Sequence, residues 1–356
     1  MCPDLRSAED DPSPLRSSLP VASPSLPSAT PLSATPPSGP LPSATLAEVG
    51  EGEVLRQIFP RLPHSDAELL GPGDDCAVMA APDVRFVVTT DTMVQGPDFR
   101  TAWSTPHDLG WKAAMTNLAD GLRDACVEAA PGCGVVGGDL STSSALTIAV
   151  TAFGSLDGAA PVTRSGARPG DVVAVAGELG LAGAGIWLLF RDGTHDSDAD
   201  GESTPDARRG RALRREHARL IEAQLAPTAP IAHGVVAREA GATAMLDVSD
   251  GLALDARRLA KASGCAVRFD SAAIAREAGA LRAVDDVVGE RATRFVLSGG
   301  EDHALLATFP PSAPLPSGFR ALGVVTEGAP DVLVGDGPFA AHGGWDPYAD
   351  WDGRAG

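Results

Sequence analysis

The chain of 356 residues is longer than a single hydrophobic core usually supports, so we expect two domains together with some unstructured sequence. Its formal net charge of −19 argues against a nucleic-acid partner, because such partners are held by a basic face that releases counterions. An acidic protein can still bind phosphate ligands when a divalent cation such as Mg²⁺ lies between its carboxylates and the ligand. The alternative is that the acidity only aids solubility.

The N-terminal segment, residues 1–45, is dominated by proline, serine, alanine and threonine. It cannot bury enough apolar surface to fold, so we expect it to be disordered. It has no apolar core of the kind that a secretory signal needs, and the five cysteines show no paired spacing. Both features are typical of a cytoplasmic protein. Folded sequence should begin with the amphipathic run 46–59.

Strand-like and helical segments alternate along the rest of the chain, which predicts a mixed α/β (α+β) protein. The expected strands are 86–90, 146–153, 172–176, 245–248, 266–269, 295–297, 304–309 and 332–334. The expected helices are 106–122, 180–190, 212–225, 231–240 and 252–263. A glycine- and proline-rich stretch, 157–169, separates an N-terminal domain, 46–157, from a C-terminal domain, 158–351. Within the second domain, the charged insert 191–209 is expected to be disordered.

Residues 172–190 are nearly uncharged, but they contain Glu178 and several glycines. They therefore predict a strand, a turn and a helix rather than a membrane span, and we expect no membrane partner. The turn, 177–183, is suited to hold a phosphate at the helix N-terminus, or it is simply a tight connection. The sequence leaves both interpretations open.

Aspartates recur beside glycine, serine or threonine at the ends of apolar segments. These sites are 71–75, 89–92, 117–120, 137–139, 247–251 and, with a glutamate, 298–302. One such site usually marks a turn or a helix cap. Several together indicate a ligand site, because clustered carboxylates repel one another unless a cation joins them. Oxygen ligands select Mg²⁺, and the chain has neither zinc-type spacing nor a G-x-x-x-x-G-K-[ST] phosphate loop.

In this order, these sites resemble the thiamine-monophosphate kinase family, which shares a superfamily with aminoimidazole ribonucleotide synthetase and selenophosphate synthetase. The stretches that carry the resemblance are GPGDDCAV (71–78), TTDTMVQG (89–96), KAAMTNLAD (112–120), VVGGDLS (135–141), TRSGARPGD (163–171), LDVSDGL (246–252), LSGGEDHALL (297–306) and GGWDPY (343–348). The resemblance implies a two-domain aminoimidazole ribonucleotide synthetase-like fold, and a homodimer whose subunits join their N-terminal sheets. It also implies Mg²⁺-dependent, in-line transfer of a phosphoryl group from ATP to thiamine monophosphate, without a covalent phospho-enzyme.

The resemblance also assigns roles to residues by position. The implied metal ligands are Asp75, Thr89, Thr90, Asp91, Asp120, Asp139, Asp247 and Asp250. The implied nucleotide contacts are Gly138, Asp139, Arg164 and Ser249. The implied substrate contacts are Glu301, Trp345 and Asp98, which stands where the family commonly has a histidine. From the residues alone, Trp345 fits ordinary packing as well as ring stacking.

One departure from the family follows Asp120. The family continues there with a helix end, a strand and another helix start, whereas this chain passes directly to Gly121 and Leu122. A strand of the N-terminal sheet is therefore expected to be missing, which would expose a sheet edge or require a new pairing. Two alternatives to kinase activity follow: another ATP-dependent synthetase of the superfamily, or a catalytically defective homologue that only binds metal and nucleotide.

Overall fold

The computed structural model describes residues 59–70, 78–81, 86–116, 126–128, 130–138, 144–196, 203–341 and 343–344. The N-terminal segment and most of the amphipathic run 46–59 lie outside the described residues. So do four of the implied site residues, Asp75, Asp120, Asp139 and Trp345, and the segment in which a strand is expected to be missing.

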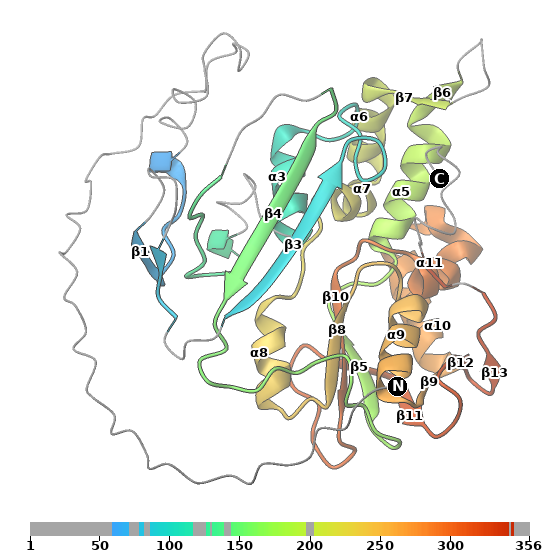
Figure 1. Cartoon of the computed structure of the whole chain (residues 1–356). Helices are drawn as coiled ribbons and strands as arrows, with labels where there is room; N and C mark the ends of the chain where they lie inside the picture. The colour runs from blue at the N-terminus through green and yellow to red at the C-terminus, as the bar shows by residue number, and fades with distance from the viewer. Residues whose placement is uncertain are drawn as a thin grey trace, which may run out of the picture. The chain divides into compact units, whose positions relative to one another are not determined.

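The N-terminal half of the described chain contains two small antiparallel sheets. Its elements are η1 (Phe59–Arg61), β1 (Glu68–Leu70), β2 (Val78–Met79), β3 (Val87–Val94), α3 (Pro106–Thr116) and β4 (Thr147–Gly154). β1 pairs with β2, and β3 pairs with β4 along its whole length. Figure 1 shows β3 and β4 side by side. Near the end of β3, Met93 packs with Phe99, Leu109 and Ala113 in a small core beside α3.

The C-terminal half is built on a seven-stranded sheet in the order β13-β12-β9-β11-β5-β10-β8. Its strands are β5 (Val172–Ala176), β8 (Ala244–Val248), β9 (Ala266–Phe269), β10 (Ala304–Phe309), β11 (Arg320–Thr326), β12 (Val332–Val334) and β13 (Gly337–Pro338). Neighbours are antiparallel except β9 and β12. The central strand β5 reads VVAVA because both of its faces are buried.

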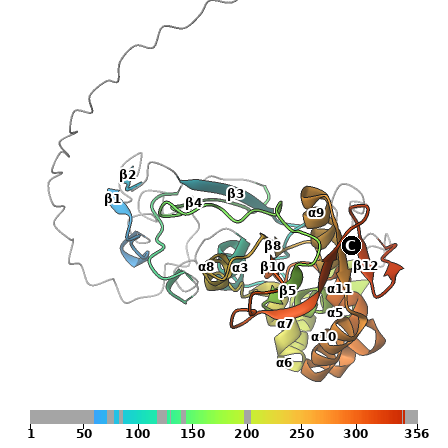
Figure 2. The ribbon, with the colours of Figure 1, turned by 90° about the horizontal axis from the view of Figure 1, so that it is seen from below.

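Helices cover both faces of this sheet. They are α5 (Leu181–Asp192), α6 (Ala207–Glu216), α7 (Ala218–Leu225), α8 (Ala232–Glu239), α9 (Leu252–Ser263), α10 (Ser271–Val284), η2 (Asp286–Arg291) and α11 (Ala292–Ser298). Val173 and Val175 of β5 belong to the large core that includes α5, α7, α9, α10 and α11. Ala174 and Ala176 face a smaller core beside α8, and Figure 2 shows α8 on the other side of β5 and β10 from α5, α10 and α11.

The predicted mixed α/β class is confirmed, with three differences in detail. Residues 295–297, expected to be a strand, belong to helix α11, because a short apolar run is compatible with either structure. The expected helix 212–225 is broken at His217, which ends α6 and precedes α7. None of the helices in the described ranges is long and apolar enough to cross a membrane.

The third difference is the charged insert 191–209, which is not disordered at either end. β6 (Thr194–Asp196) pairs with β7 (Ser203–Pro205), and only 197–202 lie outside the described residues. The side chain of Asp206 caps α6 by accepting a hydrogen bond from the Arg209 amide at 2.8 Å. Local capping and strand pairing therefore order a segment whose composition alone predicts disorder.

Candidate active site

A cavity of about 380 Å³ lies where several turns and helices of the two halves meet. Its walls come from the turn before α3, from α5 and α7, from the turn after β8, and from η2 and α11 with the turn that follows them. Three of the implied site residues line it: Asp98, Ser249 and Glu301. Residues more than 200 positions apart in the sequence therefore share one ligand-sized space.

Asp98 is held by the turn that ends β3. Its Oδ2 accepts a hydrogen bond from the Val94 amide at 2.7 Å, and its own amide donates to the Val94 carbonyl at 3.1 Å. Burial raises the pKa of this carboxyl above its ordinary value, and the charges of Glu301 and Asp91 act in the same direction. The Val94 hydrogen bond and the Lys112 charge oppose that rise only in part.

Glu301 occupies the turn between α11 and β10 in a left-handed backbone conformation, with φ 69°. Its amide donates to the Ser249 carbonyl at 2.6 Å, which joins two walls of the cavity. Its carboxylate contacts the buried ammonium of Lys112, and 39% of its side chain remains exposed. Burial raises the Glu301 pKa, but the positive charges of Lys112 and His303 lower it by more than burial raises it. The net Glu301 pKa therefore lies below its ordinary value.

Carboxylates of both halves influence the charge of His303. This side chain is buried, and its Nε2 has no hydrogen-bond partner within the described part of the chain. Burial lowers the His303 pKa, whereas the negative charges of Glu301, Asp247 and Asp91 raise it. Asp91 on β3 and Asp247 on β8 therefore lie near the same imidazole, although strands of different sheets carry them.

The other implied metal ligands and nucleotide contacts in the described ranges do not line this cavity. Thr89 and Thr90 are exposed on β3, and the Thr90 hydroxyl donates to the Val150 carbonyl at 3.0 Å. The Asp250 carboxylate contacts the Arg258 guanidinium at 2.5 Å. Arg164 lies in an exposed loop. Gly138 is also exposed, and no three His, Cys, Asp or Glu side chains in the described ranges form a metal-binding group.

An aromatic and arginine wall of the cavity was not predicted from the sequence. The Trp187 ring lies 5.5 Å from that of Phe295, and the guanidinium groups of Arg191 and Arg291 lie over it at 4.3 and 5.0 Å. Arg100 covers the Phe190 ring at 4.5 Å. The spacing of Trp187 and Phe190 marks one face of α5, but only the packing of α11 beside it shows that this face borders a cavity.

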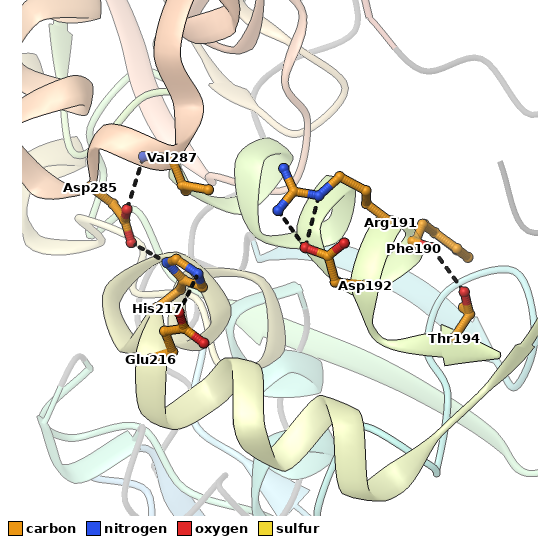
Figure 3. Close-up of polar contacts among 8 residues, drawn as sticks. All are labelled: Phe190, Arg191, Asp192, Thr194, Glu216, His217, Asp285 and Val287. Carbon is orange, nitrogen blue, oxygen red and sulfur yellow. Dashed lines mark hydrogen bonds and ion pairs between the residues drawn. The ribbon is translucent and has the colours of Figure 1, made fainter.

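Polar contacts fix the ends of this wall. The Thr194 hydroxyl donates to the Phe190 carbonyl at 3.0 Å at the end of α5 (Figure 3). His217 Nδ1 lies 2.6 Å from Asp285 Oδ2, and Asp285 Oδ1 accepts from the Val287 amide at 3.1 Å (Figure 3). The junction of α6 and α7 is thereby tied to the start of η2, the segment that carries Arg291 into the cavity.

The glycine-rich connection before α5 is occupied by a side chain of the protein itself. Asp302 is buried, and its carboxylate accepts hydrogen bonds from the Gly180 and Ala182 amides at 2.5 and 2.9 Å. These are the amides that would otherwise face a phosphate at the helix N-terminus. The structure therefore favours the interpretation of residues 177–183 as a tight connection.

Asp302 should make stability depend on pH. Burial raises its pKa to about 7, despite the two amide hydrogen bonds. Between the ordinary pKa of 3.8 and this value, the folded state retains a proton that the unfolded state loses. We therefore expect the free energy of unfolding of the wild type, relative to Asp302→Asn, to fall as pH rises from 4 to 7 and then to level off. Urea unfolding of both proteins across this range measures the difference, and a difference that is constant with pH would contradict the assignment.

Comparison with known proteins agrees with the geometry. Family models for the AIR synthase related protein match at residues 73–122 for the N-terminal domain and 168–297 for the C-terminal domain. A thiamine-monophosphate kinase of Mycobacterium tuberculosis is 39% identical over 87% of this chain and 95% of its own length. One from Corynebacterium glutamicum is 38% identical over 82% of this chain and 90% of its own length.

Solved structures show the same relationship. The thiamine monophosphate kinase of Aquifex aeolicus superposes with a TM-score of 0.57 at 26% identity, covering 84% of this chain and all of its own. The structure of AaThiL complexed with AMPPCP and TMP has a TM-score of 0.56 at 27% identity and covers 85% of this chain and 98% of its own. The chain belongs to the thiamine-monophosphate kinase family.

Proposed function

We propose that this protein is a thiamine-monophosphate kinase, which transfers the γ-phosphoryl group of ATP to thiamine monophosphate and releases thiamine diphosphate and ADP. The observation that carries the proposal is the cavity in which Asp98, Ser249 and Glu301 meet, in a chain 39% identical to a thiamine-monophosphate kinase. The related AaThiL is solved with both AMPPCP and TMP. The two ligands of that related structure correspond to the two substrates of the proposed reaction.

The charges in the cavity fit one orientation of the substrate. Its cationic thiazolium lies beside the carboxylates of Glu301 and Asp98, because opposite charges attract strongly in a partly buried site. Its phosphate points toward Asp91 and Asp247, and its neutral pyrimidine lies toward Trp187 and the arginines. In the reverse orientation, the phosphate would lie away from the Asp91 and Asp247 end of the site, where we propose that Mg²⁺ binds.

Mg²⁺ fits the Asp91 and Asp247 end of the site. The charges of Asp91 on β3 and Asp247 on β8 both act on the buried His303 imidazole, and carboxylate oxygens are the ligands that a hard cation prefers. When bound, Mg²⁺ would neutralise the charge that two phosphate chains bring together. We expect Asp75, Asp120, Asp139 and Asp250 to contribute ligands, with Gly138, Arg164 and Ser249 holding the nucleotide and Trp345 contacting the substrate.

Catalysis of this transfer depends more on the positioning of the two substrates than on a general base. An oxygen of the substrate phosphate attacks the γ-phosphorus in line, and the bond from that phosphorus to the β-γ bridging oxygen of ADP breaks. The nucleophile is already an anion near neutral pH, since the second pKa of a phosphate monoester is about 6. The part of the chain is therefore to align two anions and to stabilise the transferring group.

An apolar patch on β3 and β4 supports a homodimer. Phe86, Val88 and Phe153, at one end of the β3–β4 pair, are 49 to 62% exposed, and the Phe86 and Phe153 rings lie 6.1 Å apart. A contiguous apolar patch of this kind on a soluble protein usually marks an interface. A second copy of the chain is the occupant that the family resemblance implies. We place the protein in the cytoplasm, where the free thiols of the described cysteines would persist.

Introducing a charge into this patch should separate the subunits. We expect Phe153→Glu to give monomers at micromolar concentration, because a carboxylate in an apolar interface loses its hydration without a partner. Sedimentation velocity of the wild type and the variant measures the change. Val284→Glu is the control, since Val284 is 40% exposed on α10, away from the patch. A wild type that is monomeric, or a Phe153→Glu variant that stays dimeric, would contradict the proposed interface.

Product analysis tests the proposed function. Purified protein with ATP, Mg²⁺ and thiamine monophosphate should form thiamine diphosphate and ADP in equal amounts, as measured by chromatography. A folded protein that binds AMPPCP but forms no product would instead be the catalytically defective homologue. Consumption of ATP only with another phosphate or amide substrate would identify a different synthetase of the superfamily.

A further inference from the structure

Lys112 is one of only two lysines in the chain, and it is buried beneath the cavity. It lies on α3, and its side chain is 4% exposed. Burying an ammonium group is costly unless it is paired and hydrogen-bonded, so a lysine at such a position requires a reason. Its contacts supply one.

The Lys112 ammonium joins three groups that line the cavity. It contacts the Glu301 carboxylate, and it donates to the Asp98 carbonyl at 3.3 Å. With the Gln224 amide in the orientation that satisfies both of its polar atoms, Gln224 Oε1 accepts from Lys112 Nζ at 3.1 Å. Its nitrogen then donates to the Ala182 carbonyl at 2.9 Å. The three partners come from the turn before α3, from α7 and from the turn after α11.

We propose that Lys112 is a positioning residue for the substrate, which sets the affinity for thiamine monophosphate by fixing the Glu301 carboxylate and the Asp98 turn without contacting the ligand. This inference rests on the proposed function. Lys112 itself does not line the cavity, whereas each of its three partners does. It is therefore placed to act through them rather than directly.

The charges at this end of the cavity support the same conclusion. The Asp98 and Glu301 carboxylates together carry two negative charges, and Lys112 contributes one positive charge. The remaining single negative charge matches the single positive charge of a thiazolium ring. Without Lys112, the two carboxylates would repel each other, and the Glu301 carboxylate would lose its charged partner.

Calorimetry of binding tests the proposal, because it does not require turnover. Lys112→Met removes the charge and keeps most of the apolar stem, and we expect it to weaken thiamine monophosphate binding about tenfold or more. Binding of Mg·AMPPCP should change by less than about twofold, since the proposed contacts act on the substrate only. Lys112→Arg, which retains the charge, should lie between Lys112→Met and the wild type. Lys261→Met, which changes the exposed lysine on α9, is the matched control and should equal the wild type.

A double-mutant cycle separates positioning from general loss of structure. In a Glu301→Gln background, Lys112→Met should cost much less substrate affinity than it does in the wild type, because its principal partner is already altered. If Lys112→Met does not fold, Gln224→Met keeps the ion pair and should weaken thiamine monophosphate binding about threefold.

Several outcomes would overturn the inference. Unchanged or tighter binding of thiamine monophosphate to Lys112→Met would do so, as would equal weakening of both ligands. If Lys112→Met does not fold, unchanged substrate binding by Gln224→Met would overturn it instead. A wild-type protein that binds no thiamine monophosphate would contradict the proposed function as well. An active wild type whose variants show no difference between the two ligands would contradict only the role of Lys112.

Discussion

Replacing Asp91 with asparagine should lower kcat for thiamine diphosphate formation by at least about a hundredfold. The side chain is exposed on β3, and one of its oxygens, Oδ1, accepts a hydrogen bond from the adjacent Thr92 amide at 2.8 Å. Asparagine keeps this shape but removes the negative charge that we assign to metal binding. Folding depends little on an exposed charge, so Tm should change by less than about 2 °C. Steady-state kinetics and thermal unfolding of the same preparation measure both quantities.

Asp336→Asn is the matched control for this experiment, because the Asp336 side chain is fully exposed and lies 4.0 Å from Arg268. It should leave both kcat and Tm unchanged. If Asp91→Asn lowers stability and activity in proportion, the turn has a structural role, and the assignment of Asp91 to a metal fails. The same conclusion would follow if Asp91→Asn were fully active.

Replacing Glu301 with glutamine should lower kcat/KM for thiamine monophosphate by about thirtyfold to a hundredfold, mainly through KM. The neutral amide no longer attracts the thiazolium, and the buried Lys112 ammonium loses its carboxylate partner. KM for ATP should change little, since we assign Glu301 to the substrate rather than to the nucleotide. Initial rates with each ligand varied in turn separate the two constants.

Glu327→Gln serves as the control, because Glu327 is exposed on the turn after β11 and remote in sequence from the cavity residues. A Glu301→Gln variant with KM values like those of the wild type would show that the carboxylate is not a substrate contact. An equal rise in the two KM values would indicate a general distortion of the cavity.

The central strands could be predicted because the residues next to them in the sequence mark their boundaries. β5, β9, β10 and β12 run as expected, since each is a short apolar run bounded by glycine, proline or aspartate. The prediction of a strand at residues 295–297 was wrong, because a run of three apolar residues shows no periodicity that distinguishes a strand from a helix. His217, at the break between α6 and α7, contacts Asp285, which is 68 residues away, and no local pattern encodes that contact.

The site could be predicted only in part. Asp98, Ser249 and Glu301 were found through family resemblance, and the structure brings them to one cavity. Trp187 and Arg291 were missed because their meeting requires α5 to pack beside η2 and α11, a tertiary contact that helical spacing does not reveal. Lys112 belongs to the resembling stretch KAAMTNLAD, but the sequence does not show that its buried ammonium contacts Glu301 at the cavity.

We expect carboxylates from β3 and β8 to meet at one Mg²⁺-dependent phosphate site. A crystal structure of the protein with Mg²⁺, AMPPCP and thiamine monophosphate tests it most directly. We expect a metal ion about 2.1 Å from a carboxylate oxygen of Asp91 or Asp247, lying between the nucleotide and a substrate whose ring is beside Glu301. Both ligands bound with no metal near either aspartate, or a substrate outside the cavity, would contradict this arrangement of the site.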